Sequence, residues 1–142
     1  MGQAADVMHQ KIAAFNAQDE TKCRALMSPD VEWATPGALL HGPDQVGAFF
    51  AVLWEAFPDL ELSITRIVED GSTVIMQGRA QGTHQGTFHT PGGDIPATGK
   101  HADITYSEHF EVENGLIVSS RLIFDRLDFL EQLGAIAAPA PA

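Results

Sequence analysis

The segment that most constrains the fold runs from Glu108 to Gly134, where two strand-like runs precede a short helix-like run. Alternating apolar residues flank the dipeptide Asn114-Gly115, which is typical of a tight β-hairpin turn. Behind the second run, leucines recur at helical spacing, and Gly134 follows them as the residue type that suits a left-handed helix end. The stretch therefore predicts two long antiparallel strands, at about 101–113 and 116–125, and a short C-terminal helix.

In the region that precedes this hairpin, the spacing of apolar residues changes once, from helical spacing to the alternation typical of strands. Apolar residues at helical spacing predict helices at about 4–18, 19–27 and 42–57, with a short strand at 31–35 between the last two. From Leu60 the period becomes two, and Asp70-Gly71 predicts a second hairpin whose return strand is 73–83. A Gly/Pro/Thr-rich connection at 84–100 is either a rim loop or a distorted pair of short strands. Helices that precede the strands, instead of alternating with them, indicate an α+β fold with helices packed on one face of a curved sheet.

Length and charge restrict the classes of function. The 142 residues suffice for one domain, predicted at 1–134, with a flexible Ala/Pro tail at 135–142. A formal charge of -11 repels nucleic acid and anionic membranes, so neither is expected as a partner. The single Cys23 cannot form an internal disulfide, and no apolar run approaches the length of a membrane span. With no signal-peptide pattern at the N-terminus, a cytoplasmic location is expected.

Several motifs together resemble the SnoaL-like polyketide cyclase (ester cyclase) family of the NTF2-like superfamily. The C-terminal run Glu113–Val118, followed by Asp125 and Leu130–Gly134, is similar to the family's C-terminal signature. Four upstream segments agree in order and spacing: His41-Gly42-Pro43, Phe57-Pro58-Asp59-Leu60, Gly82-Thr83-His84-Gln85-Gly86 and Ala97-Thr98-Gly99-Lys100. The resemblance implies a cone-shaped barrel in which three helices pack on a curved antiparallel sheet.

Asp125 is the first candidate for chemistry. It follows Leu122, Ile123 and Phe124, and a carboxylate among such residues either faces a wet cavity or has a partner. One interpretation is that Asp125 caps the helix that begins at about Arg126, or pairs with a nearby arginine. The other is catalysis, and the resemblance favours it because the family's acid/base aspartate falls at this position.

The register of the last hairpin decides which side chains share a face with Asp125. A two-residue Asn114-Gly115 turn places Asp125 with Ile104, Tyr106 and Glu108, whereas a three-residue turn places it with His109 and Arg121. We prefer the second register, because it separates polar from apolar residues along both strands. It predicts that His109 and Asp125 line one cavity, where they would shuttle a proton.

The resemblance further implies an enzyme that needs no cofactor. Its reaction would be an intramolecular aldol-type cyclisation of a small hydrophobic carbonyl compound of the polyketide ester kind, with Asp125 and His109 as catalytic residues. The alternative is a non-catalytic protein that binds a small hydrophobic ligand, or another isomerase or hydrolase of the same superfamily, because fold does not fix function.

The remaining candidates are pocket residues. We expect the predicted substrate contacts to be Trp33, His41, Phe50, Trp54, His84 and Arg121. The histidines lack a recognisable metal-ligand spacing, so no metal site is predicted. We also expect a homodimer through the sheet, because one strand face would otherwise expose a large apolar surface. That face holds Tyr106, Phe110, Val118, Leu122 and Phe124.

Overall fold

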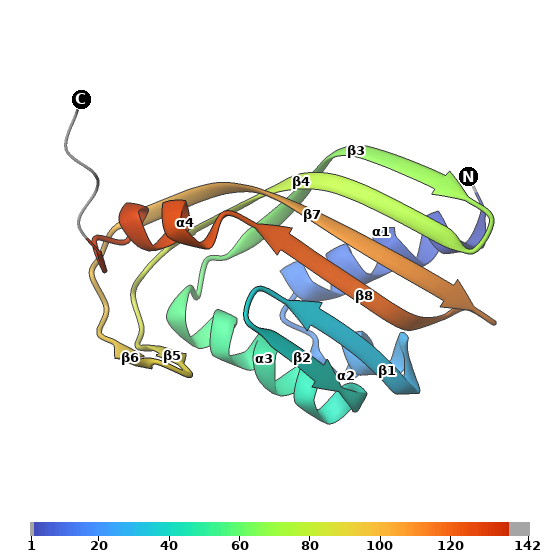
Figure 1. Cartoon of the computed structure of the whole chain (residues 1–142), viewed down its shortest axis with the longest axis horizontal. Helices are drawn as coiled ribbons and strands as arrows, with labels where there is room; N and C mark the ends of the chain where they lie inside the picture. Colours follow the sequence, from blue (N-terminus) through green and yellow to red (C-terminus); the bar gives the residue numbers. More distant parts are fainter. Residues whose placement is uncertain (1, 137–142) are drawn as a thin grey trace.

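The computed structural model describes residues 2–136, so most of the predicted tail, 137–142, lies outside the described residues. Helices on one side cover a curved sheet, as the sequence predicted (Figure 1). Within the described part of the chain, no helix is long and apolar enough to cross a membrane.

All four described helices begin within one residue of where the sequence indicated. The first, α1 (Gln3–Asn16), buries an apolar stripe, and α2 (Glu20–Ala25) is capped by Asp19, whose side chain accepts from the Lys22 amide. The third, α3 (Gly42–Ala56), carries proline in its first turn, where a missing N–H costs nothing. The short α4 (Arg126–Gln132) follows the last strand and is succeeded by Gly134 at φ +71°.

The sheet has six strands in the order β2-β1-β8-β7-β4-β3. Their bounds are β1 (Met27–Thr35), β2 (Ala38–His41), β3 (Glu61–Asp70), β4 (Thr73–Thr83), β7 (His101–Glu113) and β8 (Leu116–Phe124). Strand β2 was not predicted, and β1 begins earlier than predicted. The sheet is also mixed, not purely antiparallel, because β1 pairs with β8 in parallel. A separate two-stranded hairpin, β5 (Phe88–Thr90) and β6 (Gly93–Ile95), fills the Gly/Pro/Thr-rich connection.

The register of the β7–β8 hairpin combines both alternatives. Glu113 pairs with Leu116 across a two-residue turn in which Asn114 and Gly115 have φ of 53° and 76°, so the preferred three-residue turn is wrong. A bulge then changes the register, and Glu111 pairs with Ser119. From that point the strands have the predicted separation of polar and apolar side chains, because the bulge supplies the extra residue that a longer turn would have supplied.

The apolar side of β7 and β8 faces the helices. Tyr106 and Phe110 are buried, and Leu122 and Phe124 pack beside the core on the same side. The predicted dimer interface is therefore wrong in its residues, since an apolar strand face is buried first by the chain's own helices. The oligomeric state itself stays a prediction.

Candidate functional site

A deep cavity lies between the helices and the inner face of the sheet. Its volume is about 410 Å³, within the range of pockets that hold small organic ligands. Aromatic and aliphatic side chains form most of its wall, and the aromatic members are Phe15, Phe49, Phe50, Phe57, Phe88, Tyr106, Phe124 and Phe129. A ligand in this cavity would exchange water for an almost wholly apolar surface.

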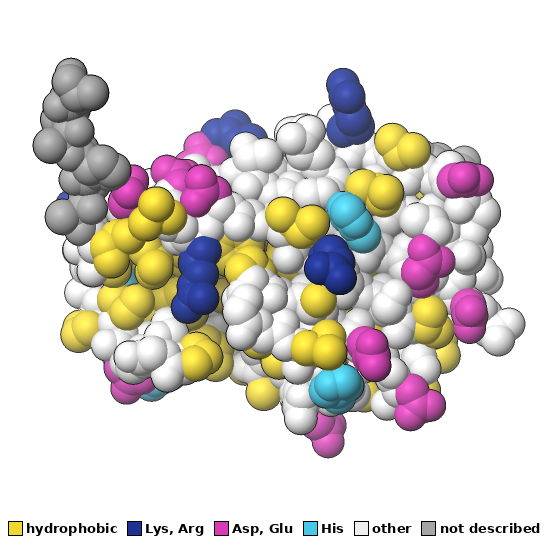
Figure 2. Space-filling view, viewed as in Figure 1, with side chains coloured by type: hydrophobic (Ala, Val, Ile, Leu, Met, Phe, Trp, Pro, Cys, Tyr) yellow, Lys and Arg dark blue, Asp and Glu magenta, His cyan; other side chains and the backbone are white. Residues whose placement is uncertain are grey.

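The cavity has an open and a closed end. Its exposed wall residues come from the β1–β2 turn, the β5–β6 hairpin and the first residue of α4. Its closed end is formed by buried side chains of α1, α3 and β7. Figure 2 shows hydrophobic side chains gathered near α4, beside a basic side chain.

One buried ion pair occupies the closed end. The Lys11 ammonium lies 3.0 and 3.1 Å from the two carboxylate oxygens of Glu108, and each side chain is only 2% exposed. The sheet neighbours of Glu108 are Met76 and Leu122, which offer it no polar partner. Lys11 reaches it from α1, and the ammonium lies 5.0 to 5.6 Å from the ring centres of Phe15, Trp33 and Phe50. Such a pair is strongly interdependent, because either charge alone would be buried without compensation.

Tyr106 adds an unsatisfied hydroxyl to the same wall. It lies two residues before Glu108 on the same strand face, is 4% exposed, and its hydroxyl has no hydrogen-bond partner among the described residues. Burial, together with the nearby Glu108 charge, raises the pKa of Tyr106 well above its ordinary value. The hydroxyl therefore stays protonated and is free to donate to a ligand.

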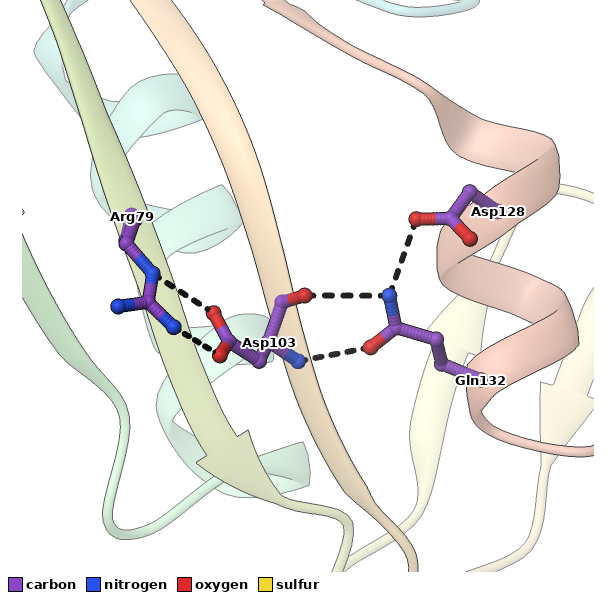
Figure 3. Close-up of polar contacts among 4 residues, drawn as sticks. All are labelled: Arg79, Asp103, Asp128 and Gln132. Atoms are coloured by element: carbon purple, nitrogen blue, oxygen red, sulfur yellow. Dashed lines mark hydrogen bonds and ion pairs between the residues drawn. The ribbon is translucent and has the colours of Figure 1, made fainter.

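A polar network on the outside holds α4 over the end of the cavity (Figure 3). The Gln132 side chain accepts from the Asp103 amide at 2.7 Å and donates to the Asp103 carbonyl at 3.1 Å, like an extra strand residue beside β7. It also donates to Asp128 at 3.0 Å, while Arg79 of β4 pairs with the Asp103 carboxylate. These bonds fix the helix that supplies Arg126 and Phe129 to the cavity wall.

The predicted catalytic residues do not line this cavity. His109 lies on the opposite face of β7, between Ile75 and Arg121, and Asp125 is an exposed cap whose carboxylate accepts from the Asp128 amide at 3.0 Å. Asp125 is four strand positions beyond Arg121, about 13 Å along the strand from the position opposite His109. The prediction that the two residues share the cavity is wrong, because the polar strand face is the solvent face.

The predicted substrate contacts divide into three groups. Phe50 lines the cavity as expected. Trp33, Trp54 and His84 lie behind the wall: Trp33 packs on Phe50, Trp54 on Phe15, and His84 stacks on Phe57. His41 and Arg121 are exposed and lie outside the cavity. Burial lowers the pKa of His84, whose ring is held by Thr98.

Sequence reasoning missed Lys11 and Glu108, although both left a signal. Lys11 falls on the apolar stripe of the first helix, between Met8 and Ile12, where a lysine is unexpected. Glu108 alternates with Tyr106 and Phe110 along a strand face that is otherwise apolar. The helix face carries one positive charge and the strand face one negative charge, and both faces are otherwise apolar. This pattern indicates that the two faces pack together so that the charges pair. Among residues 2–136, no three His, Cys, Asp or Glu side chains gather as a metal site.

The fold is that of NTF2/ketosteroid isomerase-like proteins, as comparison with known proteins shows. A Catenulispora acidiphila protein described as having a ketosteroid isomerase-like fold is 17% identical, with coverage of 95% of this chain and 97% of its own and a TM-score of 0.77. That likeness concerns the fold alone. Curated proteins give no significant match to the sequence.

Two further structures resemble this chain more closely in sequence. A Jannaschia sp. CCS1 protein assigned as a SnoaL-like polyketide cyclase is 26% identical over 96% of this chain and 94% of its own, with a TM-score of 0.83. IdmH of Streptomyces antibioticus, assigned as a polyketide cyclase, is 27% identical over 94% and 99%, with a TM-score of 0.78. The model of the SnoaL-like polyketide cyclase family matches residues 5–133, and the chain belongs to that family.

Proposed function

We propose that this protein closes a ring by an intramolecular aldol-type reaction on a small hydrophobic carbonyl compound of the polyketide ester kind, without a cofactor. The observation that carries the proposal is the buried Lys11–Glu108 pair, which lies beside the unpartnered Tyr106 hydroxyl in an otherwise apolar cavity. Membership of the SnoaL-like family supports the class of reaction.

The first step assigned to Glu108 is proton removal. Its carboxylate, which retains free lone pairs beside those that Lys11 occupies, takes the acidic proton from a carbon between two carbonyl groups. Tyr106 donates a hydrogen bond to the carbonyl oxygen that becomes the enolate oxygen. Once Glu108 is protonated, the Lys11 ammonium is no longer neutralised, and its charge stabilises the enolate in a medium of low polarity.

The second step forms the ring. The enolate carbon attacks a second carbonyl carbon of the same molecule, one carbon–carbon bond forms, and the resulting alkoxide takes the proton back from Glu108. The side chains finish as they began, so the step needs no external acid or reductant. The apolar wall contributes by holding the chain folded with its reacting carbons close together.

The test is turnover of a panel of linear β-keto esters that carry a fused aromatic core, with ring closure followed by chromatography. Wild type should close rings, Glu108→Gln should lose about 10²- to 10⁴-fold in rate, and Tyr106→Phe about 10²-fold. His109→Gln is the matched control, since it changes the next residue of the same strand on the outer face. If Glu108→Gln closes rings as fast as wild type, the proposed mechanism fails.

A second candidate is a binding protein that performs no chemistry. Both Glu108 oxygens accept from Lys11, and three aromatic rings surround the ammonium, an arrangement that also suits a purely structural pair. Tight binding of apolar ligands without ring closure of any ester in the panel would favour this candidate.

For the setting of the proposed activity we expect the cytoplasm and a homodimer. The buried, unpaired Cys23 thiol, whose pKa burial raises to about 11, suits a reducing compartment. Exposed apolar residues on the outer face of the sheet, Val68, Ile75 and Ile123, offer a surface for a second copy. Light scattering should give twice 15.3 kDa, and the monomer mass would contradict this expectation.

A further inference from the structure

We propose that Arg126 at the open end of the cavity binds an anionic group of the ligand, so that the ligand is an amphiphile with an apolar body and an acidic head, such as a carboxylate. This inference rests on the proposed function, because it assumes that the cavity described above holds the substrate. It adds to that function the class of substrate and the direction in which the substrate enters.

The distribution of charge along the cavity is the first observation. The chain carries 19 acidic residues and a net charge of -11, yet among residues 2–136 Glu108 is the only carboxylate that lines the cavity. Glu108 is neutralised by Lys11 at the closed end. Arg126 also lines the cavity, and its positive charge is not neutralised by a carboxylate of the wall, whereas His89 at the rim is bonded to Asp94 and Glu55. An unneutralised guanidinium at the open end favours a ligand that carries an anionic group there.

The position of Arg126 is the second observation. It is the first residue of α4, and its guanidinium extends to the β1–β2 turn, where Nη1 lies 2.9 Å from the place that a Cβ of Gly37 would occupy. Gly37 has φ +87° and no side chain, so the turn leaves room for the guanidinium at the rim. Both residues line the cavity and both are exposed.

The ion pairs of the other basic wall residues distinguish Arg126 from them. Lys11 pairs with Glu108, and His89 lies between Asp94 at 2.9 Å and Glu55 at 2.8 Å. Within residues 2–136, Arg126 makes no ion pair or hydrogen bond through its guanidinium. A planar guanidinium with five free donors is well suited to a carboxylate, sulfonate or phosphate.

The two ends of the cavity then fix the orientation of the ligand. The acidic head stays at the rim with Arg126, where water still reaches it, and the apolar body extends toward Lys11 and Glu108. A ligand entering in the reverse direction would bury its charge among aromatic rings, beside a pair that is already neutral. The carbonyl groups that react must therefore lie at the end of the molecule that is remote from its acidic group.

The test compares two fluorescent probes that share one ring system, phenylnaphthylamine, which is neutral, and anilinonaphthalene sulfonate, which carries an anion. Arg126→Gln should weaken binding of the sulfonate about three- to tenfold and change binding of the neutral probe less than twofold. Arg126→Lys should recover part of the loss, and added salt should weaken sulfonate binding in wild type more than in Arg126→Gln. Arg121→Gln is the matched control, because it removes the same charge from the outer face of the sheet.

The possible binding results separate three claims: the role of Arg126, a general effect of net charge, and the apolar cavity itself. If the neutral probe binds wild type but Arg126→Gln leaves the sulfonate unaffected, this inference fails and the apolar cavity stands. If Arg121→Gln weakens the sulfonate as much as Arg126→Gln, the effect is one of net charge, and the assignment of Arg126 is likewise overturned. If the neutral probe does not bind wild type at all, the proposed function and this inference fail together.

Discussion

The two faces of strand β7 differ in their exposure to water: the inner face is buried against the cavity, and the outer face is partly exposed. On the inner face, Glu108 is buried among apolar neighbours and has one partner, Lys11. On the outer face, the next residue, His109, lies beside Arg121 and is partly exposed to water. A charge on the inner face has a fixed partner and low polarity around it, and these are the conditions under which a side chain becomes reactive. Residues next to each other in sequence therefore differ in environment because of strand parity alone.

The largest expected effect separates these two neighbours. Glu108→Gln leaves the Lys11 ammonium buried without a counter-charge, and we expect it to lower the free energy of unfolding by about 3–5 kcal/mol. His109→Gln should change it by no more than about 0.5 kcal/mol, because the site is a partly exposed surface. Urea unfolding of the two variants at neutral pH measures the difference. Equal losses of unfolding free energy in the two variants would show that burial on the inner face does not make Glu108 more important for stability than His109.

A double variant sharpens the same comparison. In Lys11→Met/Glu108→Gln no charge stays buried, so most of the stability lost in Glu108→Gln should return, to within about 1–2 kcal/mol of wild type. The proposed turnover should stay absent, because the proton acceptor is missing. A double variant that is as unstable as Glu108→Gln would mean that the loss came from packing and not from charge.

The helix cap at Asp125 tests the outer side of the hairpin. Asp125→Ala removes the acceptor of the Asp128 amide and should cost about 1 kcal/mol of stability. Binding of phenylnaphthylamine and turnover should be unchanged, since Asp125 lies outside the cavity. Loss of turnover in Asp125→Asn, with the fold intact, would restore the catalytic reading that the sequence favoured and contradict the position found here.

These cases show which parts of the molecule could be predicted from sequence. The elements were predictable because period, turn residues and caps are local: a hairpin turn formed at Asn114-Gly115, with two residues instead of the preferred three, and Asp19 formed the expected cap. The bulge in β8 was not predictable, because no local residue type marks it. The face that meets the cavity was also misjudged, since polar residues were expected to surround a reactive site. The structure has an apolar site in which one ion pair is isolated, and Lys11 on an apolar helix stripe was the signal for it.

The smallest expected effect concerns the clamp at the mouth, where His89 of the β5–β6 hairpin bonds to Asp94 and to Glu55 of α3. The hydrogen bond that the His89 ring donates to Asp94, together with the charges of Asp94 and Glu55, raises the pKa of His89 above its ordinary value. A raised pKa in the folded state means that the pairing stabilises the protein fully below the ordinary histidine pKa, and that this stabilisation is lost as the pH rises through the folded-state pKa.

His89→Gln should therefore be less stable than wild type at pH about 5.5, and the difference should shrink toward pH about 9. Denaturant unfolding of both proteins at the two pH values measures it, because contributions from all other groups cancel in the difference. A difference in unfolding free energy that stays constant with pH would show that His89 stabilises the protein by packing alone and not through its charge.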